Sequence, residues 1–457
     1  MADKYFSYLG NDTTGTGSVG NPYRTPEKVL GIGAGSIAPA YGDNLIGIPH
    51  PTQDEDAYAA AGNPGTGLTP FFRPIGITGT PAEGNRLTIK SADPAIPLIL
   101  KCGAGGGQDG TSCFGVSGTP YVTYDNVIPA PNQALVIRLI NGSHYCKIKN
   151  THVNGGARAV TNSSGNYYAL YLEDCDDCEL YNFWIERMYN GDGVPNAQCG
   201  GIVQFDCERL LAHQGYIFDV GTIIDDKEGG PGSTYRKIHG ARWTNNGILL
   251  NQLGGGAGDK VNQLYEQILL VGGDTGIKSN LTTHAQVFDG IVFRNITIYN
   301  VVKGYVGIDN ADYVRNQEFH SNIVVVNTAF GWQVFEILGG AAPQSDYISN
   351  HNVYRQLGGG SQGFTLPGDT EDLTEWRADH GLDLNSITTD PAFEGATLLD
   401  TDPAVNWRPT AGNAAWTAGR DGGAAGCYRT PSDIIGLISN PSLPSGGDRL
   451  VKGVRMS

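Results

Sequence analysis

Polar side chains that can do chemistry recur at the ends of short apolar segments in the middle of the chain. If these segments are equivalent strands that stack on one another, their outward side chains form one stripe: Glu173, Asp206, Asp219, Asn251, Lys278, Asp309 and Glu336. Paired strands lie about 4.8 Å apart, so carboxylates would be separated by about 5 Å on adjacent strands and about 10 Å two strands apart. These separations are close to those in retaining and inverting glycoside hydrolases.

The stripe supplies candidates for two kinds of carbohydrate cleavage. For hydrolysis, the candidate acid, base or nucleophile is Glu173, Asp206 or Asp219. A polysaccharide lyase instead needs a base and a cation that stabilises the charge developing beside a uronic carboxylate, roles that Lys278 with Asp206 or Asp309 would fill. Each carboxylate can also be read as an ordinary solvated strand residue.

The remaining polar groups of the stripe are candidates for sugar binding. Asn251, Asp309 and Glu336 would contact hydroxyl groups, and Trp184 and Tyr189 would stack on sugar rings. Trp243 and Trp332 are further stacking candidates, although aromatic residues also fill packing gaps or meet a neighbouring subunit.

Metal binding has weaker support in the sequence. Two carboxylate-rich runs offer the oxygen ligands that Ca²⁺ prefers, namely Asp174, Asp176, Asp177 and Glu179, and the run from Asp225 to Glu228. Neither has EF-hand spacing, and solvated turns are the alternative. The pair Cys175 and Cys178 lacks the second pair of ligands that a zinc site needs. Ca²⁺ is therefore the only cofactor considered, and no metal ligand is assigned.

The elements that position these groups repeat along the chain. From about residue 135 to 355, a short apolar strand, a tight polar turn and a second short strand recur, with second-strand centres 24 to 32 residues apart. Repeats of this size indicate a solenoid. Several strands alternate apolar and polar residues, as expected when one face lines a core and the other meets water. The sequence therefore predicts an all-β parallel β-helix.

Stacked coils would place equivalent residues in ladders. Cys146 with Cys178, Cys175 with Cys207, and Asn150 with Asn182 occupy matching positions in successive repeats. We interpret all three pairs as internal stacks with a structural role. Cys102 and Cys113 flank a Gly-rich segment and are a possible disulfide.

The ends of the chain do not keep this rhythm. Residues 1–130 are expected to form an N-terminal cap and first coils with long loops, 131–355 the regular coils, and 356–457 a C-terminal cap. Thr25 before Pro26 predicts the start of a short capping helix. Asp372 with Glu375 predicts another short helix that starts with a capping box.

The composition of the chain limits the classes of molecule that it can bind. The chain of 457 residues has a net charge of −16, with 30 basic against 46 acidic residues, which argues against nucleic acid and favours a polysaccharide. No apolar stretch reaches membrane-spanning length, so no membrane insertion is expected. The first residues lack the pattern of a signal peptide, which predicts either that a signal was removed or that the protein is carried in a virus particle.

Both ends resemble the pectate-lyase-like superfamily of right-handed parallel β-helix proteins. Gly10-Asn11-Asp12, Gly15-Thr16-Gly17 and Asn21 to Thr25 resemble its opening segment, and Trp376, Gly381 to Ser386 and Asp390 to Phe393 its closing segment. The superfamily includes polysaccharide lyases, glycosidases, phage tailspikes and binding proteins without known activity. The resemblance implies a carbohydrate-binding solenoid, but no catalytic signature transfers residue by residue.

Three functions follow as hypotheses. The first is a virion spike, a phage tailspike or head spike, that binds host surface polysaccharide, either with or without hydrolysing it, and whose partners would include other virion proteins. The resemblance to such spikes implies a homotrimer. The second is a secreted bacterial lyase or glycoside hydrolase, and the third a non-catalytic structural or adhesive β-helix.

Overall fold

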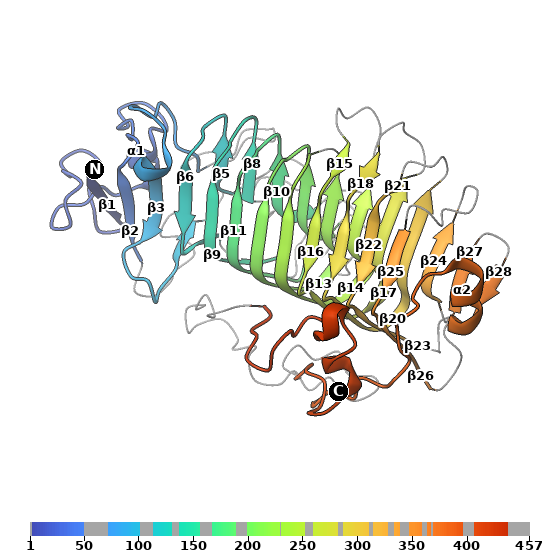
Figure 1. The fold of residues 1–457 in the computed structure, drawn as a ribbon. Coiled ribbons are helices and arrows are strands. Elements are labelled where there is room, and N and C mark those ends of the chain that lie inside the picture. Colours follow the sequence, from blue (N-terminus) through green and yellow to red (C-terminus); the bar gives the residue numbers. More distant parts are fainter. Residues whose placement is uncertain are drawn as a thin grey trace.

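A computed structural model describes residues 2–49, 72–100, 113–129, 137–155, 167–188, 199–228, 230–251, 259–281, 287–309, 314–327, 333–338, 347–358, 363–366, 369–395 and 406–436. Its strands wind into an elongated stack of coils (Figure 1). Almost all neighbouring strands pair in parallel, the exception being the antiparallel pair at the C-terminal end, β27 with β28 (Asp369–Glu371). This pairing makes the fold a parallel β-helix, as the repeats predict.

Each coil contributes strands to three faces. Face 1 consists of β5 (Gly115–Ser117), β8 (Ile137–Ile140), β10 (Tyr167–Glu173), β12 (Cys199–Phe205), β24 (Gln333–Leu338), β27 (Gly363–Leu366) and the last parts of β13 (Leu211–Lys227), β14 (Thr234–Asn251), β17 (Leu269–Leu281) and β20 (Thr297–Asp309).

Face 2 follows face 1 along the chain. It consists of β1 (Asp3–Ser7), β2 (Asn44–Ile48), β3 (Leu87–Ser91), β6 (Val122–Asp125), β16 (Leu264–Glu266), β19 (Val292–Arg294), β22 (Gln317–His320), β25 (Tyr347–Asn350) and the first parts of β9 (Lys147–Asn154), β11 (Glu179–Glu186), β13 and β14. Short strands β15 (Lys260–Val261), β18 (Phe288–Asp289) and β21 (Val314–Arg315) pair in the turn between faces 1 and 2.

Face 3 closes the coil. It consists of β4 (Leu98–Leu100), β7 (Val127–Pro129), β23 (Ile323–Asn327), β26 (Val353–Leu357), the last parts of β9 and β11, the middle of β13 and β14, and the first parts of β17 and β20. The parallel ladder thus begins at β1, ahead of the regular repeats.

Single residues with left-handed backbone turn the chain between faces 2 and 3. Asn150 and Asn182, both with φ of 52°, stack at this bend, and the Asn182 amide donates to the Asn150 side-chain oxygen over 2.7 Å. Asn adopts this conformation more readily than most residues. The predicted asparagine ladder is confirmed.

The core is a cylinder of stacked side chains. Residues in register, such as Leu170, Ile202 and Ile224, are almost wholly buried. The predicted cysteine ladders are confirmed: the Cys175 and Cys207 sulfurs lie 3.4 Å apart, and the Cys146 N–H donates to the Cys178 sulfur over 3.3 Å. All four thiols are buried and free. Cys102 lies outside the described residues, and the Cys113 thiol is free and donates to the Leu100 carbonyl.

Two short α-helices occupy the predicted positions. The first, α1 (Pro26–Leu30), begins after Thr25, whose hydroxyl accepts from the Lys28 N–H. The second, α2 (Leu373–His380), begins with the complete capping box of Asp372 and Glu375. The other helices in the described part of the chain are 3₁₀ turns, η1 (Glu83–Asn85), η2 (Ala414–Trp416) and η3 (Arg420–Gly422). None of the helices in the described ranges has the length and hydrophobicity of a membrane span.

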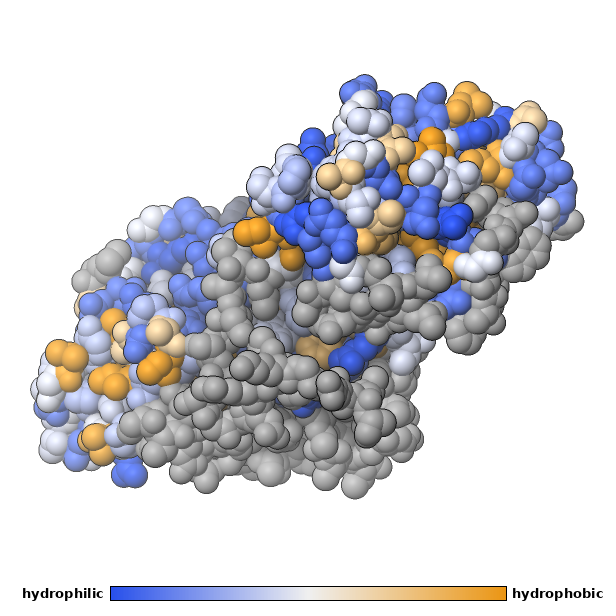
Figure 2. Space-filling view, turned by 90° about the horizontal axis from the view of Figure 1, so that it is seen from below, coloured by the Kyte–Doolittle hydropathy of each residue, from blue (hydrophilic) through white to orange (hydrophobic). Residues whose placement is uncertain are grey.

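After α2 the chain runs back beneath the stack, where the red segment lies under face 3 in Figure 1. Trp407, Phe393 and Cys427 of this segment pack with face 3 residues such as Tyr299 and Val325 in a second hydrophobic cluster. Seen from below, hydrophobic groups on the described surface are small and separated by hydrophilic ones (Figure 2). The described part of the C-terminal segment therefore covers this part of face 3.

Candidate functional site

The strand register divides the predicted polar stripe. Glu173 pairs with Phe205, which pairs with Lys227, and Lys227 pairs with Asn251. Glu173 and Asn251 therefore share one outward column of face 1. Lys278 and Glu336 share a second column, because each pairs with Val306. The prediction of one continuous stripe is wrong, since bends and inserted residues shift the register between repeats.

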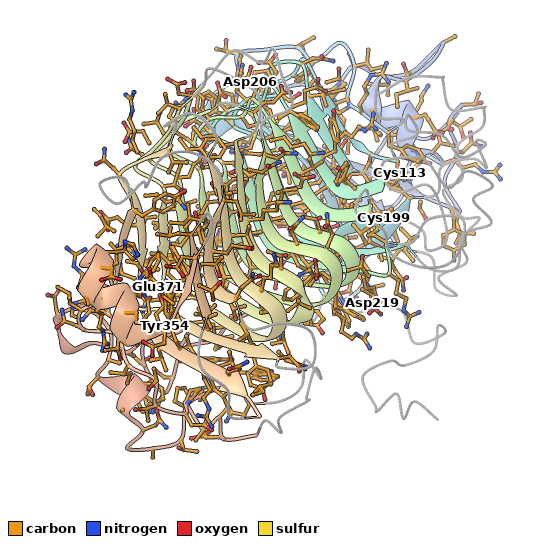
Figure 3. The ribbon with its side chains drawn as sticks, turned by 90° about the vertical axis from the view of Figure 1, so that its right-hand side faces the viewer. Cys113, Cys199, Asp206, Asp219, Tyr354 and Glu371 are labelled. Atoms are coloured by element: carbon orange, nitrogen blue, oxygen red, sulfur yellow. The ribbon has the colours of Figure 1, made fainter. Side chains whose placement is uncertain are left out.

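Asp206 and Asp219 border face 1 at opposite edges (Figure 3). Asp206 is exposed and follows β12 with φ of 50°, at the turn toward face 2. Asp219 has φ of 53° and lies at the bend from face 3 into face 1, where its carboxylate is 2.8 Å from the Arg242 guanidinium. These two carboxylates therefore do not form an acid–base pair with each other.

The other predicted residues are more scattered. Glu336 is buried and forms a 2.7 Å ion pair with Lys303. Trp184 lies on face 3, where it stacks on His152 with ring centroids 4.7 Å apart. Asp309 ends β20, and its side chain lies outside the described structure. Tyr189 and Trp332 also lie outside the described residues, and Trp243 is buried with its N–H donated to the Thr275 carbonyl.

The carboxylates of the two acidic runs are held by separate partners. Asp177 binds Arg209 at 2.8 Å, and Glu179 contacts both His213 at 3.0 Å and Lys147 at 3.3 Å. These contacts hold the pKa of Glu179 at about 2, chiefly through the hydrogen bond from His213. Among the described residues, no group of three or more His, Cys, Asp or Glu side chains could hold a metal ion. In the described structure, neither run gathers three such ligands at one point.

A denser polar cluster lies on the outer side of face 1. Asp225 and Lys227 are two residues apart on β13, so both side chains point outward, and their charged groups are 3.0 Å apart. The Lys227 ammonium donates to the Tyr168 hydroxyl over 2.8 Å, and that hydroxyl donates to Asp225 over 3.2 Å. The three side chains are nearly buried. We call Tyr168, Asp225 and Lys227 the face 1 triad.

The pKa of Asp225 is shifted in an unusual direction for a carboxyl group beside a lysine. Burial raises the pKa of Asp225, and the attraction of Lys227 only partly opposes the shift. Burial and the neighbouring Asp225 also raise the pKa of Tyr168. The second oxygen of Asp225, Oδ1, is buried without a hydrogen-bond partner. A carboxyl group with a raised pKa and a free oxygen can give or take a proton.

Glu173 belongs to the same surface. Its Oε2 accepts from the Tyr171 hydroxyl over 3.1 Å, and the Arg138 guanidinium lies 4.7 Å from the Tyr171 ring. Tyr171 is two coils from Asp225 in one column, since Val203 pairs with both. Two coils correspond to about 10 Å. Of the predicted catalytic residues, the fold brings two near the triad: Glu173, and Lys278, which is two coils from Asp225 in the same column because Leu249 pairs with both.

The sequence analysis did not predict the triad, although the alternation of residues along one strand contains part of the information needed. Asp225 and Lys227 were grouped with Asp226 as one acidic run, although alternation along a strand separates them. Asp226 points inward, where it binds Lys260 and accepts from Gln204 over 2.6 Å. Tyr168 comes from a strand two coils away, so only the register reveals its role.

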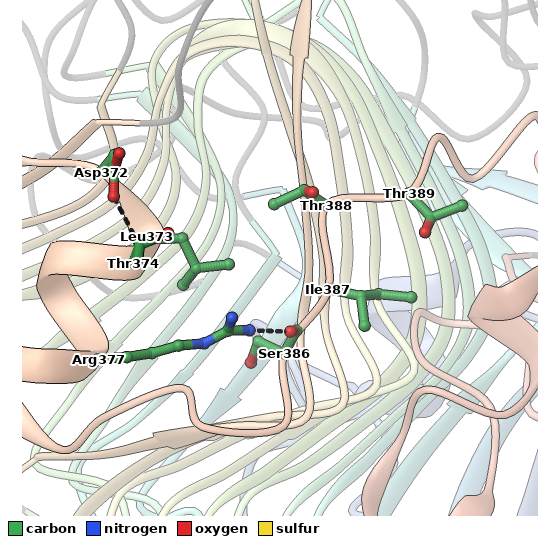
Figure 4. A pocket seen from close by; sticks show the side chains of 8 residues that line it. All are labelled: Asp372, Leu373, Thr374, Arg377, Ser386, Ile387, Thr388 and Thr389. Atoms are coloured by element: carbon green, nitrogen blue, oxygen red, sulfur yellow. Dashed lines mark hydrogen bonds between the residues drawn. The ribbon is translucent and has the colours of Figure 1, made fainter.

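Two cavities lie outside the triad. One, of about 440 Å³, lies beside α2, where Arg377 donates to the Ser386 carbonyl and Asp372 accepts from the Thr374 N–H (Figure 4). Its polar groups are engaged in capping the chain end. The other, of about 430 Å³, lies at the bend between faces 3 and 1 and is lined by Asp219, Arg242, Gly272, Asn300 and Asn327, among others.

No family model matches this chain, and no curated protein does. Solved structures of similar fold include pectate lyase Pel9A, with 11% identity, a TM-score of 0.48 and coverage of 94% of this chain and 96% of that chain. The GH136 lacto-N-biosidase from Eubacterium ramulus has 10% identity, a TM-score of 0.46 and coverage of 85% and 67%. The Dettilon tailspike protein has 11% identity, a TM-score of 0.38 and coverage of 67% and 63%.

These structures resemble the chain in fold, and it is the strand pairing that establishes the parallel β-helix. The parallel β-helix that the resemblance of the chain ends implies is confirmed by this strand pairing.

Proposed function

We propose that this chain binds a carbohydrate polymer across face 1 and that Asp225 exchanges a proton with it. The observation that carries the proposal is the face 1 triad, in which a buried carboxyl of raised pKa keeps one oxygen free. Burying such a group costs stability, and perturbed carboxyls of this kind concentrate at functional sites. The resemblance of both chain ends to carbohydrate-active β-helix proteins supports the same conclusion.

The triad suits either of two reactions. In hydrolysis, protonated Asp225 would donate to the leaving oxygen while Glu173 assists water or the sugar from the neighbouring columns. In elimination, Lys227 would stabilise negative charge at a uronic carboxylate while Asp225 or Tyr168 takes the proton. Lys278, Asp206 and Asp219 remain candidates for binding along the same face or its edges.

Product analysis tests the proposal. The full chain would be incubated with neutral and uronic polysaccharides, and the products weighed by mass spectrometry, because elimination leaves an unsaturated sugar and hydrolysis adds water. We expect Asp225→Asn to lower kcat by about 100-fold or more. The control is Asp174→Asn, which changes an exposed carboxylate in a left-handed turn and should leave kcat unchanged.

Activity that survives Asp225→Asn would refute this catalytic role. If Glu173→Gln, Asp206→Asn and Asp219→Asn also left cleavage and binding unchanged, the non-catalytic adhesive hypothesis would gain.

The finer proposal is that the binder is a homotrimeric virion spike for host surface polysaccharide. It rests on the superfamily resemblance, and a secreted bacterial lyase or hydrolase is the alternative. Light scattering of the full chain separates one copy of 48.5 kDa from three. A single-chain mass would count against the spike.

A further inference from the structure

Four polar side chains gather on the outer side of face 3. The Glu186 Oε1 accepts from the Asn154 amide over 2.7 Å and is hydrogen-bonded to the His152 Nε2 over 3.0 Å. The His152 ring in turn stacks on Trp184. His152 and Glu186 are each 2% exposed, and Trp184 is 9% exposed. We call His152, Asn154, Trp184 and Glu186 the face 3 cluster.

Every member of the face 3 cluster has a buried polar atom without a hydrogen-bond partner: His152 Nδ1, Asn154 Oδ1, Trp184 Nε1 and Glu186 Oε2. So many orphaned atoms at one place are unusual, because buried polar groups are normally satisfied. An ionised carboxylate and an amide oxygen only accept, and the His152 Nδ1 also accepts when Nε2 donates to Glu186. Among the described residues, His152 is the one basic side chain in contact with Glu186. The cluster therefore lacks a cation with several N–H donors.

The described C-terminal segment runs along face 3 toward the N-terminal end of the β-helix. The Gly426 N–H donates to the Ser321 carbonyl over 2.7 Å. Ten residues later the Gly436 N–H donates to the Lys237 carbonyl over 3.0 Å, three coils closer to the N-terminus. Ile435 packs against the hydrophobic residues of face 3 on the way. The segment thus crosses the coils one after another in a single direction.

The same direction leads from Gly436 to the face 3 cluster. Gly436 lies beside His239, since an added Cβ would be 3.4 Å from the His239 Cβ. His239 pairs with Tyr216, and Tyr216 pairs with Trp184. The cluster therefore begins two coils, or about 10 Å, beyond the point that the described segment reaches.

The chain continues after Gly436 with residues 437–457, which we call the tail and which lie outside the described ranges. The tail contains three basic residues, Arg449, Lys452 and Arg455, and a single acidic one. The stretch from Gly436 to Arg449 can span up to about 43 Å when extended, so length does not prevent any of the three from reaching Glu186. The tail thus offers the charge and the N–H donors that the face 3 cluster lacks.

We propose that the tail binds along face 3 over the face 3 cluster and that one of its basic side chains pairs with Glu186. The guanidinium or ammonium group donates to Glu186 Oε2 and Asn154 Oδ1, two of the acceptors that have no partner. The tail then acts as a latch that joins the end of the chain to the middle of the stack. This interaction lies on face 3 and does not depend on any reaction at the face 1 triad.

Limited trypsin digestion of the full chain tests the proposal. Trypsin cuts after Arg449, Lys452 and Arg455, and a bound segment is cut only when it detaches. We expect Glu186→Gln to speed release of the tail peptides by about tenfold or more, because it removes the charge that holds the segment. Intact-mass spectrometry follows each cut.

The matched control for the digestion is Glu266→Gln. It removes a partly buried carboxylate on face 2 that pairs with Arg294 at 2.9 Å, and it should leave tail release at the native rate. Cleavage after Arg355, within β26, reports unfolding of the coils and should stay slow in every variant.

A second measurement observes the cluster while changing only the tail. In the full chain labelled with ¹⁵N-tryptophan, the Trp184 Nε1–H resonance is assigned with Trp184→Phe. We expect the triple variant Arg449→Gln, Lys452→Gln, Arg455→Gln to move this resonance and to leave those of Trp243 and Trp376, which donate inside the coils, unchanged. This variant decides the question if Glu186→Gln melts well below the native chain.

The rival cation within the same chain is Arg158, which follows Asn154 closely in the sequence and also lies outside the described ranges. We expect Arg158→Gln to leave both the tail cleavage rate and the Trp184 resonance unchanged. A Trp184 resonance that moves with Arg158→Gln but not with the triple variant would overturn the proposal.

Two further results would also overturn it. One is a tail that trypsin releases equally fast from the native chain and from Glu186→Gln. The other is protection of the tail that disappears on dilution, because the tail of a second copy would then occupy face 3 in place of the chain's own.

Discussion

Asp225 and Asp226 are neighbours on one strand, yet they belong to two different regions of the molecule. Asp226 lies inside the cylinder, fully buried, and is bound by Lys260, Gln204 and Tyr265. Asp225 lies on the outer side of face 1, almost as buried, with one oxygen unpartnered. Burial is similar in both, so the difference lies in how completely each charge is satisfied. The interior satisfies its carboxylate, whereas face 1 leaves one oxygen of Asp225 without a hydrogen bond.

The largest expected effect on stability is at Asp226. Asp226→Asn removes the charge that pairs with the fully buried Lys260 ammonium and should cost about 3–5 kcal/mol of unfolding free energy. Denaturant unfolding checks this value. The double variant Asp226→Leu with Lys260→Met should recover most of the loss, because it leaves no buried charge unpaired. If Asp226→Asn were as stable as the native chain, the interior carboxylate would not be held more firmly than the one on face 1.

Asp225→Asn should have the opposite effect on stability. Its pKa is raised in the folded chain, so the folded state binds protons more tightly, and stability falls as pH rises from the ordinary value of 3.8 through the folded pKa. At neutral pH the substitution should therefore stabilise the chain, because the folded state disfavours the charged form of Asp225 even beside Lys227. Melting temperatures of both chains from pH 4 to 8 test this, and a destabilised variant would mean that the pair with Lys227 is structural.

A substitution at the bend between faces 2 and 3 should have an intermediate effect on the free energy of unfolding. Asn182→Ala removes the amide that donates to Asn150 and places alanine at φ of 52°, so we expect a loss of about 2 kcal/mol. Asn182→Gly keeps the backbone unstrained and should lose less. Equal losses in the two variants, measured by urea unfolding, would show that backbone conformation contributes little.

The smallest effect is expected at Glu179, on the exterior of face 2. Its folded pKa of about 2 lies below the ordinary 4.5, so its contribution is present above pH 4.5 and is lost as pH falls toward 2. Glu179→Gln should lower stability at pH 7 by less than about 1 kcal/mol, because the pair is partly exposed. The native and variant melting curves should converge near pH 2, and a difference that persists there would exclude this charge as the cause.

The fold could be predicted because its signals are local and repeated. Apolar strands at regular intervals, Thr25 before Pro26, and Asp372 with Glu375 each report structure through their near neighbours in the chain. The cysteine and asparagine ladders were also accessible, since Cys175 and Cys207 keep the same spacing as Asn150 and Asn182. The candidate site was predicted only in part, through Glu173 and Lys278.

The rest of the candidate site could not be predicted, because it depends on the register between strands. The chain alone determines that short strands stack in parallel coils, because a repeated apolar pattern can be buried in only a few ways. It does not determine which residues face each other across coils of unequal length, because one inserted residue moves a side chain to the other face. Only the folded molecule sends Asp225 outward to Tyr168 and Asp226 inward to Lys260.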